Sequence, residues 1–388
     1  MAKTYYSMGL LTADESWRMI RTIRAEPSGG INETLEVSAA RRRDFQMALE
    51  QAQQQYIAAA QVGYESRPLN LFYGLSQAGR AIAAASPKLG GRTGRHWQGA
   101  GHGLHFDTEI GSMGPLMSRI KVGDGSADLF SRLSTAIGSP SDLRSVTFGE
   151  VLEQIPDYGM EFRDESVAGR AIHNFNLYTA PVAFPLELEV QLPGLPPEGP
   201  LDESAVRAIA DHYPALRALQ VSTLESGLAK RSHNPGRIMF TIDNIEQLTR
   251  SPSGPYVPSG AMLYRRNPVL LPEIGEVQRE VRPLASWWIV LFALSMLARY
   301  APHHWTRAMS ISESRIASRV EFILDTALHA VPELIWSELA LIKEPTRPVR
   351  SRFMVRLARL LTSRNDRIYG WIPMSQYGGT NRVAVADG

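Results

Sequence analysis

The chain has 388 residues, a length that favours two domains or one large domain with an insertion. Hydrophobic residues make up 44% of the sequence and charged residues 21%, values that exclude a disordered chain and are typical of a soluble globular protein. The formal net charge of +2 excludes a global electrostatic commitment to nucleic acid or to an anionic membrane. The absence of cysteine excludes disulfides, thiolate zinc sites, iron–sulfur clusters and cysteine nucleophiles, and fits a cytoplasmic protein.

The N-terminal third of the sequence is predicted to be helical. Thr12 and Glu15 have the spacing of a capping box, which predicts a helix over residues 12–24. Residues 38–63 are rich in Ala, Gln and Arg, all of which favour the helical state, and Gly63 is the expected stop. Two long helices are therefore expected before residue 64.

A third helix is predicted between Ser66, a candidate N-cap, and Pro87. Gly74 and Gly79 lower the helix propensity of this segment and indicate that a neighbouring element approaches closely. Residues 88–125 then change character, because they are polar and rich in glycine, and they predict a loop.

The middle of the chain is predicted to contain strands. β-branched and aromatic residues in alternation, punctuated by proline, indicate extended segments. These segments are 106–122, 172–192, 236–243 and 257–272. Among them one helix is expected over residues 203–219, with Asp202 as its N-cap.

The chain returns to helical patterns after Pro283. The apolar run over residues 284–298 is short of the roughly 20 residues that a spanning helix needs, so it predicts a buried core helix and no membrane partner. Ser310 and Glu313 have capping-box spacing, which predicts the start of a further helix after a break at Pro302. The later helices are expected over 310–329, 332–343 and 348–362.

These elements predict an α+β fold that is predominantly helical. The expected regions are 1–87, helical; 88–282, mixed α+β with the glycine-rich loop; and 283–388, helical. The first and the last are expected to pack together as one unit around the β-containing middle.

The densest group of chemically capable residues follows the apolar run, at Arg299, Tyr300, His303 and His304. Arg299 and His304 are separated by four residues, an arrangement that resembles the signature of HEPN-type ribonucleases. The resemblance implies His304 as the base and Arg299 as the phosphate clamp, in a reaction that needs no metal. Two departures stand against it, because Tyr300 replaces the small polar residue usual after the arginine and Pro302 breaks the helix between the pair.

A structural alternative explains the same residues. Arg299 would cap the last carbonyls of the apolar helix, while Tyr300 and Trp305 would pack the turn and leave His303 and His304 in solvent. The sequence favours this alternative over a catalytic one.

The glycine-rich loop is the second candidate site. His102 and His105 have H-x-x-H spacing, but no convincing third ligand follows, so no metal site is predicted. The loop could instead contact a phosphate or nucleotide through Arg92, Arg95, His102 and its backbone amides. The loop lacks the Gly-Lys-Ser/Thr ending of a P-loop, so a plain ordered loop is the alternative.

Three further groups have simpler explanations. Residues 343–367 carry many arginines and predict either a solvated helix face or a phosphate- or partner-binding face. The acidic residues from Asp157 to Glu165 predict a solvated turn. Trp287 and Trp288 lie in the apolar run and are expected in the core.

Three segments together resemble the YaaC-like family of bacterial proteins: SRPLNLFYGLSQAGRAI (66–82), GHGL (101–104) and LSMLARYAPHHW (294–305). They occur in the order and at the separations of that family, so the resemblance covers most of the chain. It implies a bacterial cytoplasmic protein and no established reaction. It also favours a structural or binding role for Arg299, Tyr300 and Trp305, because the family shares the LARY-x-P-x-x-W frame more clearly than a histidine at position 304.

Two functions are expected from these patterns. The first is a binding or scaffold protein, working as a homo-oligomer or as a subunit of a defence or stress complex. The second is a metal-independent, HEPN-like ribonuclease or nucleotide-acting effector that uses Arg299 and His304. RNA, a nucleotide or a protein is the expected partner, and no cofactor is predicted.

Overall fold

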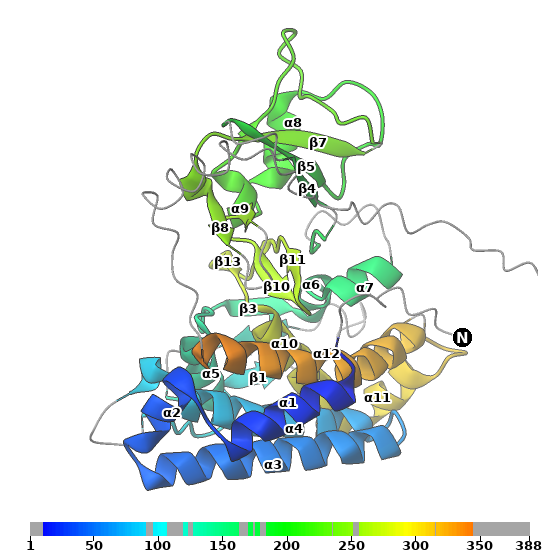
Figure 1. Cartoon of the computed structure of the whole chain (residues 1–388). Coiled ribbons are helices and arrows are strands. Elements are labelled where there is room, and N and C mark those ends of the chain that lie inside the picture. The colour runs from blue at the N-terminus through cyan, green and yellow to red at the C-terminus, as the bar shows by residue number, and fades with distance from the viewer. Residues whose placement is uncertain are drawn as a thin grey trace, which may run out of the picture.

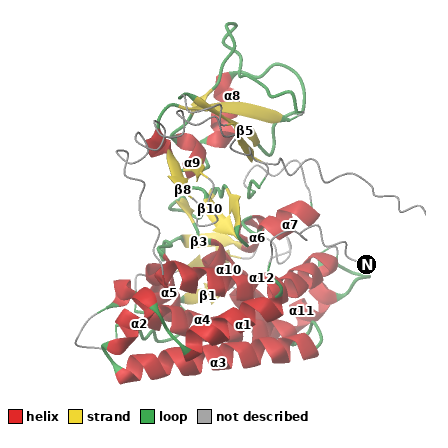
Figure 2. Cartoon of the chain, viewed as in Figure 1, coloured by secondary structure: helices red, strands yellow, loops and turns green. Residues whose placement is uncertain are grey.

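The computed structural model describes residues 11–90, 96–106, 119–122, 127–162, 170–173, 175–178, 184–234, 236–250, 256–314 and 316–343. These residues form an α+β fold with a helical layer and a strand-rich part stacked on it (Figure 1). Helices from both ends of the described chain make the helical layer, and most strands lie in the other part (Figure 2). The predicted fold class and the packing of the terminal helices against each other are therefore confirmed.

The N-terminal elements are α1 (Ala13–Ala25), α2 (Gly29–Glu36), α3 (Ala39–Gln61), α4 (Arg67–Ala85) and the 3₁₀ turn η1 (Pro87–Leu89). The predicted capping box is present at the start of α1, because Thr12 Oγ1 accepts from the Glu15 amide and the Glu15 carboxylate accepts from the Thr12 amide. α3 begins after Ser38, whose side chain caps it. Ser66 precedes α4 as predicted but makes no capping hydrogen bond. No helix was predicted over α2, because the two glycines that open it lower its helix propensity. Burial of one side of this segment against other elements stabilises the helix.

The C-terminal helices are α10 (Pro283–Tyr300), α11 (Pro302–Met309) and α12 (Ala317–Lys343). The prediction of a helix start at Ser310 is wrong, because residues 310–314 form a turn and α12 starts at Ala317. The predicted division of this region near Pro332 is also wrong, since α12 continues through that residue. Pro332 has no backbone N–H to donate to the preceding turn. Packing of α12 against α1, α2 and α4 compensates for this lost hydrogen bond.

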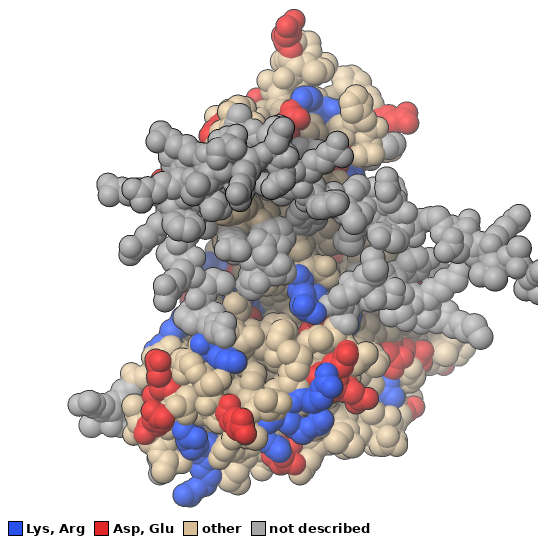
Figure 3. Space-filling model, in the orientation of Figure 1, with Lys and Arg blue, Asp and Glu red and all other residues tan. Residues whose placement is uncertain are grey.

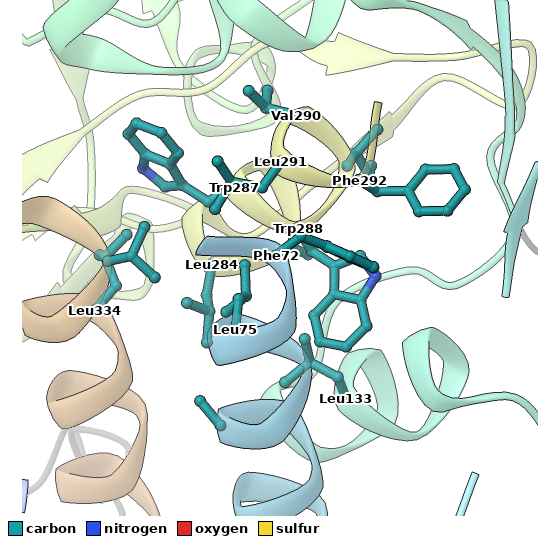
Figure 4. Close-up of a cluster of buried hydrophobic side chains, with 14 of the residues drawn as sticks. Phe72, Leu75, Leu133, Leu284, Trp287, Trp288, Val290, Leu291, Phe292 and Leu334 are labelled. Carbon is teal, nitrogen blue, oxygen red and sulfur yellow. The ribbon is translucent and has the colours of Figure 1, made fainter. Parts of the chain in front are cut away.

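α10 is the central helix of the layer, as the apolar run predicted. It is the one described helix long and apolar enough to cross a membrane, and 78% of that stretch is buried inside the protein. Trp287 and Trp288 are both fully buried, which confirms that they are core residues. In Figure 4 Trp288 points from α10 toward α4 and α5 (Leu129–Ile137), next to Leu133.

The two glycines in α4 are where other elements approach closely. A Cβ on Gly79 would lie 2.6 Å from Trp288 Cζ3, and a Cβ on Gly74 would lie 2.6 Å from Tyr56 Cδ2 of α3. Both distances are shorter than real Cβ contacts, so α4 packs this tightly only because these positions lack a side chain. The close approach that the sequence indicated is confirmed.

The first part of the middle region packs directly on the helical layer. It consists of β1 (Leu104–Phe106), β2 (Arg119–Val122), β3 (Arg144–Thr147), α5, α6 (Phe148–Glu153) and α7 (Pro156–Glu161). The strands form an antiparallel sheet in the order β1-β2-β3, with Leu104 opposite Val122 and Val122 opposite Arg144. Its buried side chains belong to the same core as the helical layer.

The second part of the middle region has a hydrophobic core of its own. Its main sheet has the order β4-β5-β7-β6, and the strands are β4 (Phe175–Tyr178), β5 (Leu186–Gln191), β6 (Gln220–Val221) and β7 (Arg237–Ile242). The single helix predicted over 203–219 is wrong in extent, because Pro214 starts a new turn: α8 (Glu203–Ala210) is followed by α9 (Pro214–Arg217). Asp202 precedes α8 without a side-chain capping bond.

A series of two-stranded antiparallel hairpins connects the two cores. The elements are η3 (Ile245–Gln247), β8 (Leu248–Arg250), β9 (Tyr256–Pro258), β10 (Met262–Tyr264), β11 (Asn267–Val269), β12 (Glu273–Ile274) and β13 (Arg279–Glu280). Arg265 and Arg266 form the turn between β10 and β11, with φ angles of 47° and 67°. Two positive φ angles define a type I′ turn, which usually takes asparagine and glycine.

Arg265 holds this turn against the helical layer through two buried acids. Its Nε donates to Glu333 of α12 at 3.1 Å, and its Nη1 lies 3.4 Å from Asp157 Oδ1 of α7. Tyr264 also donates to Asp157, and Trp287 Nε1 donates to the Tyr264 hydroxyl at 3.2 Å. The prediction of a solvated acidic turn is therefore wrong for Asp157, which is 6% exposed.

Candidate functional site

Arg299 lies in the last turn of α10 with its side chain on the surface. Its Nη1 donates to the hydroxyl of Tyr73 at 2.8 Å. The guanidinium carbon lies 4.9 Å from the ring centroid of Tyr300 and 5.9 Å from that of Tyr73. Arg299 is thus fixed between two tyrosines, one from α4 and one from its own helix, by a hydrogen bond and by cation–π contacts.

His102 lies in the segment that leads into β1, and it is linked to Arg299 through Phe72, whose ring lies 6.3 Å from that of Tyr73. Its ring meets Phe72 edge-on at a centroid distance of 5.2 Å and Phe292 at 6.2 Å. Burial, the charge of Arg299 and the charge of Arg80 lower the pKa of His102, in that order of size. The imidazole is therefore neutral near pH 7, and its buried Nδ1 has no hydrogen-bond partner among the described residues.

The glycines of the loop explain how His102 reaches this position. A Cβ on Gly99 would lie 2.5 Å from the backbone of Leu129, and one on Gly103 would overlap the side chain of Asp128. Gly103 also has a φ of +78°, which other residues rarely adopt. The loop can therefore run directly over the start of α5, where Asp128 caps the helix through the Ser131 amide.

A buried arginine anchors the other end of the same segment. Arg41 of α3 donates to the carbonyls of Ala84 and Ser86 at the end of α4, and its guanidinium lies 5.0 Å from the ring of Trp97. Trp97 Nε1 donates to Asp44 at 3.1 Å. These contacts fix residues 96–106 against the helical layer and thereby position His102.

Arg80 is a second exposed arginine, on the same helix as Tyr73. It lies on the exposed side of α4, seven residues and so about two helical turns after Tyr73, and its charge contributes to the lowered pKa of His102. Neither Arg80 nor Arg299 forms an ion pair with a carboxylate in the part of the chain that the structure describes. We name Arg80, His102 and Arg299 the arginine–histidine cluster.

Other arginines of the helical layer are paired with acids, as Arg24 is with Glu50 and Arg67 is with Asp325. Elsewhere, basic and acidic side chains alternate over the face shown in Figure 3, as in an ordinary solvated surface. Among the buried arginines, Arg265 is paired with Asp157 and Glu333, whereas Arg41 donates to backbone carbonyls.

The other predicted site residues near α10 lie apart from the cluster. Pro302 starts α11, on which the side chains of His303 and His304 are exposed and, within the described residues, form no hydrogen bond, ion pair or ring contact. Trp305 is buried, and its Nε1 donates to the Glu65 carbonyl at 3.1 Å. The structure therefore brings Arg299 together with His102 and Tyr300, and it shows no interaction between Arg299 and His304.

Two other predictions fall outside the described residues. Arg92 and Arg95 of the glycine-rich loop belong to the stretch 91–95, and all but the first residue of the basic segment 343–367 lies beyond Lys343. Tyr73 and Arg80, in contrast, were absent from the predicted site. Their spacing of seven residues places both on one side of a helix, but that spacing alone does not indicate a ligand site.

The fold and the site define an α+β protein with a basic and aromatic surface site at one end of its central helix. A family model described as YaaC-like Protein matches residues 22–339, and the chain belongs to this family. No curated protein and no solved structure matched the chain. The three segments that carried the resemblance in sequence meet in space, because they supply Tyr73 and Arg80, then His102, then Arg299 and Tyr300.

Proposed function

We propose that this chain is a binding protein that holds an anionic ligand, the phosphate group of RNA or of a nucleotide, at the arginine–histidine cluster. The observation that carries the proposal is a pair of arginines that have no acidic partner among the residues that the structure describes, together with a neutral imidazole. Arginine offers a planar fork of donors that matches a phosphate, and a neutral imidazole can donate one further hydrogen bond. An anion would balance charges that the described protein leaves unbalanced.

The geometry of Arg299 supports the same proposal. Its hydrogen bond to Tyr73 and its contact with Tyr300 restrict a side chain that would otherwise lose rotamer freedom on binding. Such preorganisation increases the affinity for a ligand. Because Nη1 is the atom bonded to Tyr73, the remaining N–H donors of the fork are available to an anion.

The proposal extends to the setting in which the protein works. We expect a bacterial, cytoplasmic protein that acts as a homo-oligomer or as a subunit of a defence or stress complex. The family resemblance and the cysteine-free composition support the cytoplasmic setting.

A metal-independent ribonuclease that uses Arg299 and His304 is the second candidate. Arg299 ends α10 and His304 lies in the first turn of α11, and both side chains are exposed and open to a substrate. In this reaction His304 would take the proton from a ribose 2′-hydroxyl, and Arg299 would bind the phosphate.

Fluorescence anisotropy with a labelled twelve-nucleotide poly-U RNA at low salt, in EDTA, tests the binding proposal. Arg299→Ala and Arg80→Ala are each expected to weaken binding about tenfold, as the loss of a charged hydrogen bond predicts. Arg307→Ala is the matched control, because Arg307 is an exposed arginine on α11. If the wild type does not bind, or if all three variants bind equally, the proposal is wrong.

The same reactions, separated on a denaturing gel, decide the second candidate. Cleavage that disappears in both Arg299→Ala and His304→Ala would establish the ribonuclease. Intact RNA in every lane, together with binding by the wild type, would leave the binding function alone.

A further inference from the structure

The two tyrosines beside Arg299 point to a ligand with an aromatic group as well as a phosphate. Tyr300 is 57% exposed and Tyr73 is 36% exposed, although both are large rings. Isolated exposed tyrosines need no explanation, but these two flank the same arginine.

The arginine fixes the orientation of both rings. Arg299 lies over Tyr300 at 4.9 Å and is hydrogen-bonded to the hydroxyl of Tyr73. The exposed part of Tyr300 is thus held in place before a ligand arrives. A fixed ring with an exposed surface is what a nucleobase needs for stacking, and stacking of this kind tolerates any base.

The distance along α4 fits a ligand with two different ends. Tyr73 and Arg80 are seven residues apart, so about 10 Å of helix separates their backbones. A single phosphate group cannot span both, whereas a nucleotide carries a base at one end and a phosphate at the other. Arg299 and His102 lie at the Tyr73 end, since Arg299 donates to the Tyr73 hydroxyl at 2.8 Å and the His102 ring lies 5.2 Å from that of Phe72.

We infer that the ligand unit is a 5′-nucleotide, free or as part of single-stranded RNA, whose base stacks on Tyr300 and Tyr73 while its phosphate binds the arginine–histidine cluster. This inference rests on the proposed function, because it uses the same anion site. It adds that Tyr300 is a specificity-determining residue, which separates nucleotides from other phosphates.

Isothermal titration with 5′-UMP and with ribose 5-phosphate tests the inference. The two probes share the sugar and the phosphate, and only UMP has a base. We expect UMP to bind wild type on the order of tenfold more tightly than ribose 5-phosphate, which is the gain that stacking of one base gives. Tyr300→Leu keeps an apolar side chain but removes the ring, so UMP should bind this variant no more tightly than ribose 5-phosphate does. Any loss that comes from the freed Arg299 side chain should weaken both probes equally, so the ratio of their affinities reports on stacking alone.

The outcomes separate the inference from the proposed function. If both probes bind equally to wild type and Arg299→Ala abolishes both, the anion site stands and base recognition is wrong. If neither probe binds, the anion site and the base recognition are both wrong for nucleotides. Titration with the twelve-nucleotide RNA in the same series distinguishes the two sources of the unit, since a site for RNA would bind the oligomer more tightly than UMP.

Discussion

Replacement of Arg265 by glycine should destabilise the protein strongly, because this side chain is the shared partner of two buried acids. Asp157 is 6% exposed and Glu333 is fully buried, and Arg265 contacts both. Removal of one partner of a buried ion pair costs about 3–5 kcal/mol, and we expect about 3 kcal/mol here because Tyr264 still donates to Asp157. Glycine suits the φ of 47°, so backbone strain does not contribute to the loss.

Arg266→Gly is the matched control, since it makes the same change at the next turn position, where φ is 67° and the side chain is exposed. Urea denaturation followed by tryptophan fluorescence measures both variants, and Trp287 reports on the region through its bond to Tyr264. Arg266→Gly should cost clearly less than Arg265→Gly, because the interactions of an exposed charge contribute little to stability. Equal stability of the two variants would refute the ion-pair reasoning.

The same experiment at lower pH gives a second check on the ion pairs. Burial already raises the pKa of Asp157 and of Glu333 in the presence of Arg265. Without the arginine the pKa of both carboxyl groups should rise further, because the charged carboxylates lose the guanidinium that stabilised them. The loss of stability in Arg265→Gly should therefore be smaller at pH 5 than at pH 8.

Two further predictions concern a carboxyl pair and a glycine. Glu280 lies opposite Glu273 across the β12–β13 hairpin, and burial raises its pKa to about 7 from an ordinary value of 4.5. The folded state therefore binds a proton on Glu280 more tightly than the unfolded state does. The stabilisation that this protonation gives is complete below pH 4.5 and is lost as the pH rises through about 7. Glu280→Gln should raise the thermal unfolding midpoint at pH 8 and change it little at pH 5, and a parallel pH dependence in both proteins would contradict this. Gly79→Ala should lower the free energy of unfolding by about 1–3 kcal/mol, because its Cβ would lie 2.6 Å from Trp288. Gln77→Ala is the control and should lower it little. Equal urea midpoints for the two variants would show that the contact with Trp288 relaxes freely.

Local patterns in the sequence were sufficient to predict the elements that local chemistry determines. The capping box at Thr12 and the apolar run of α10 both appear where expected, because each depends on neighbouring residues in the chain. α12 shows the limit of such patterns. A capping-box spacing at Ser310 and a proline at 332 predict two separate helices, yet packing on both sides of α12 produces one helix that begins later.

Buried polar residues were the least predictable feature of the fold. Asp157 lies in a run of acids that reads as a solvated turn, and its partner Arg265 is more than a hundred positions away. Arg41 is likewise 1% exposed, although it stands in a run of three arginines. No short-range pattern indicates which charge of such a run will be enclosed, since the choice depends on distant partners.

The candidate site was partly predictable for a related reason. His102, Arg299 and Tyr300 stood out as capable side chains within distinctive segments, and the structure brings these three together. Tyr73 and Arg80 did not stand out, because their role depends on which side of α4 faces the end of α10. Sequence spacing paired Arg299 with His304, whereas the structure places its guanidinium against Tyr73 and Tyr300.

The most direct test of the anion site is the pKa of His102, measured by nuclear magnetic resonance of the ring carbons with and without 5′-UMP. The chain has nine histidines, and a His102→Gln variant assigns the signal. We predict a pKa below 6.5 in the free protein, because burial and two arginines disfavour the charged ring, and a rise when the bound phosphate offsets those charges. The signals of His303 and His304 should not move. A pKa of His102 that is unchanged at saturating UMP would contradict the account.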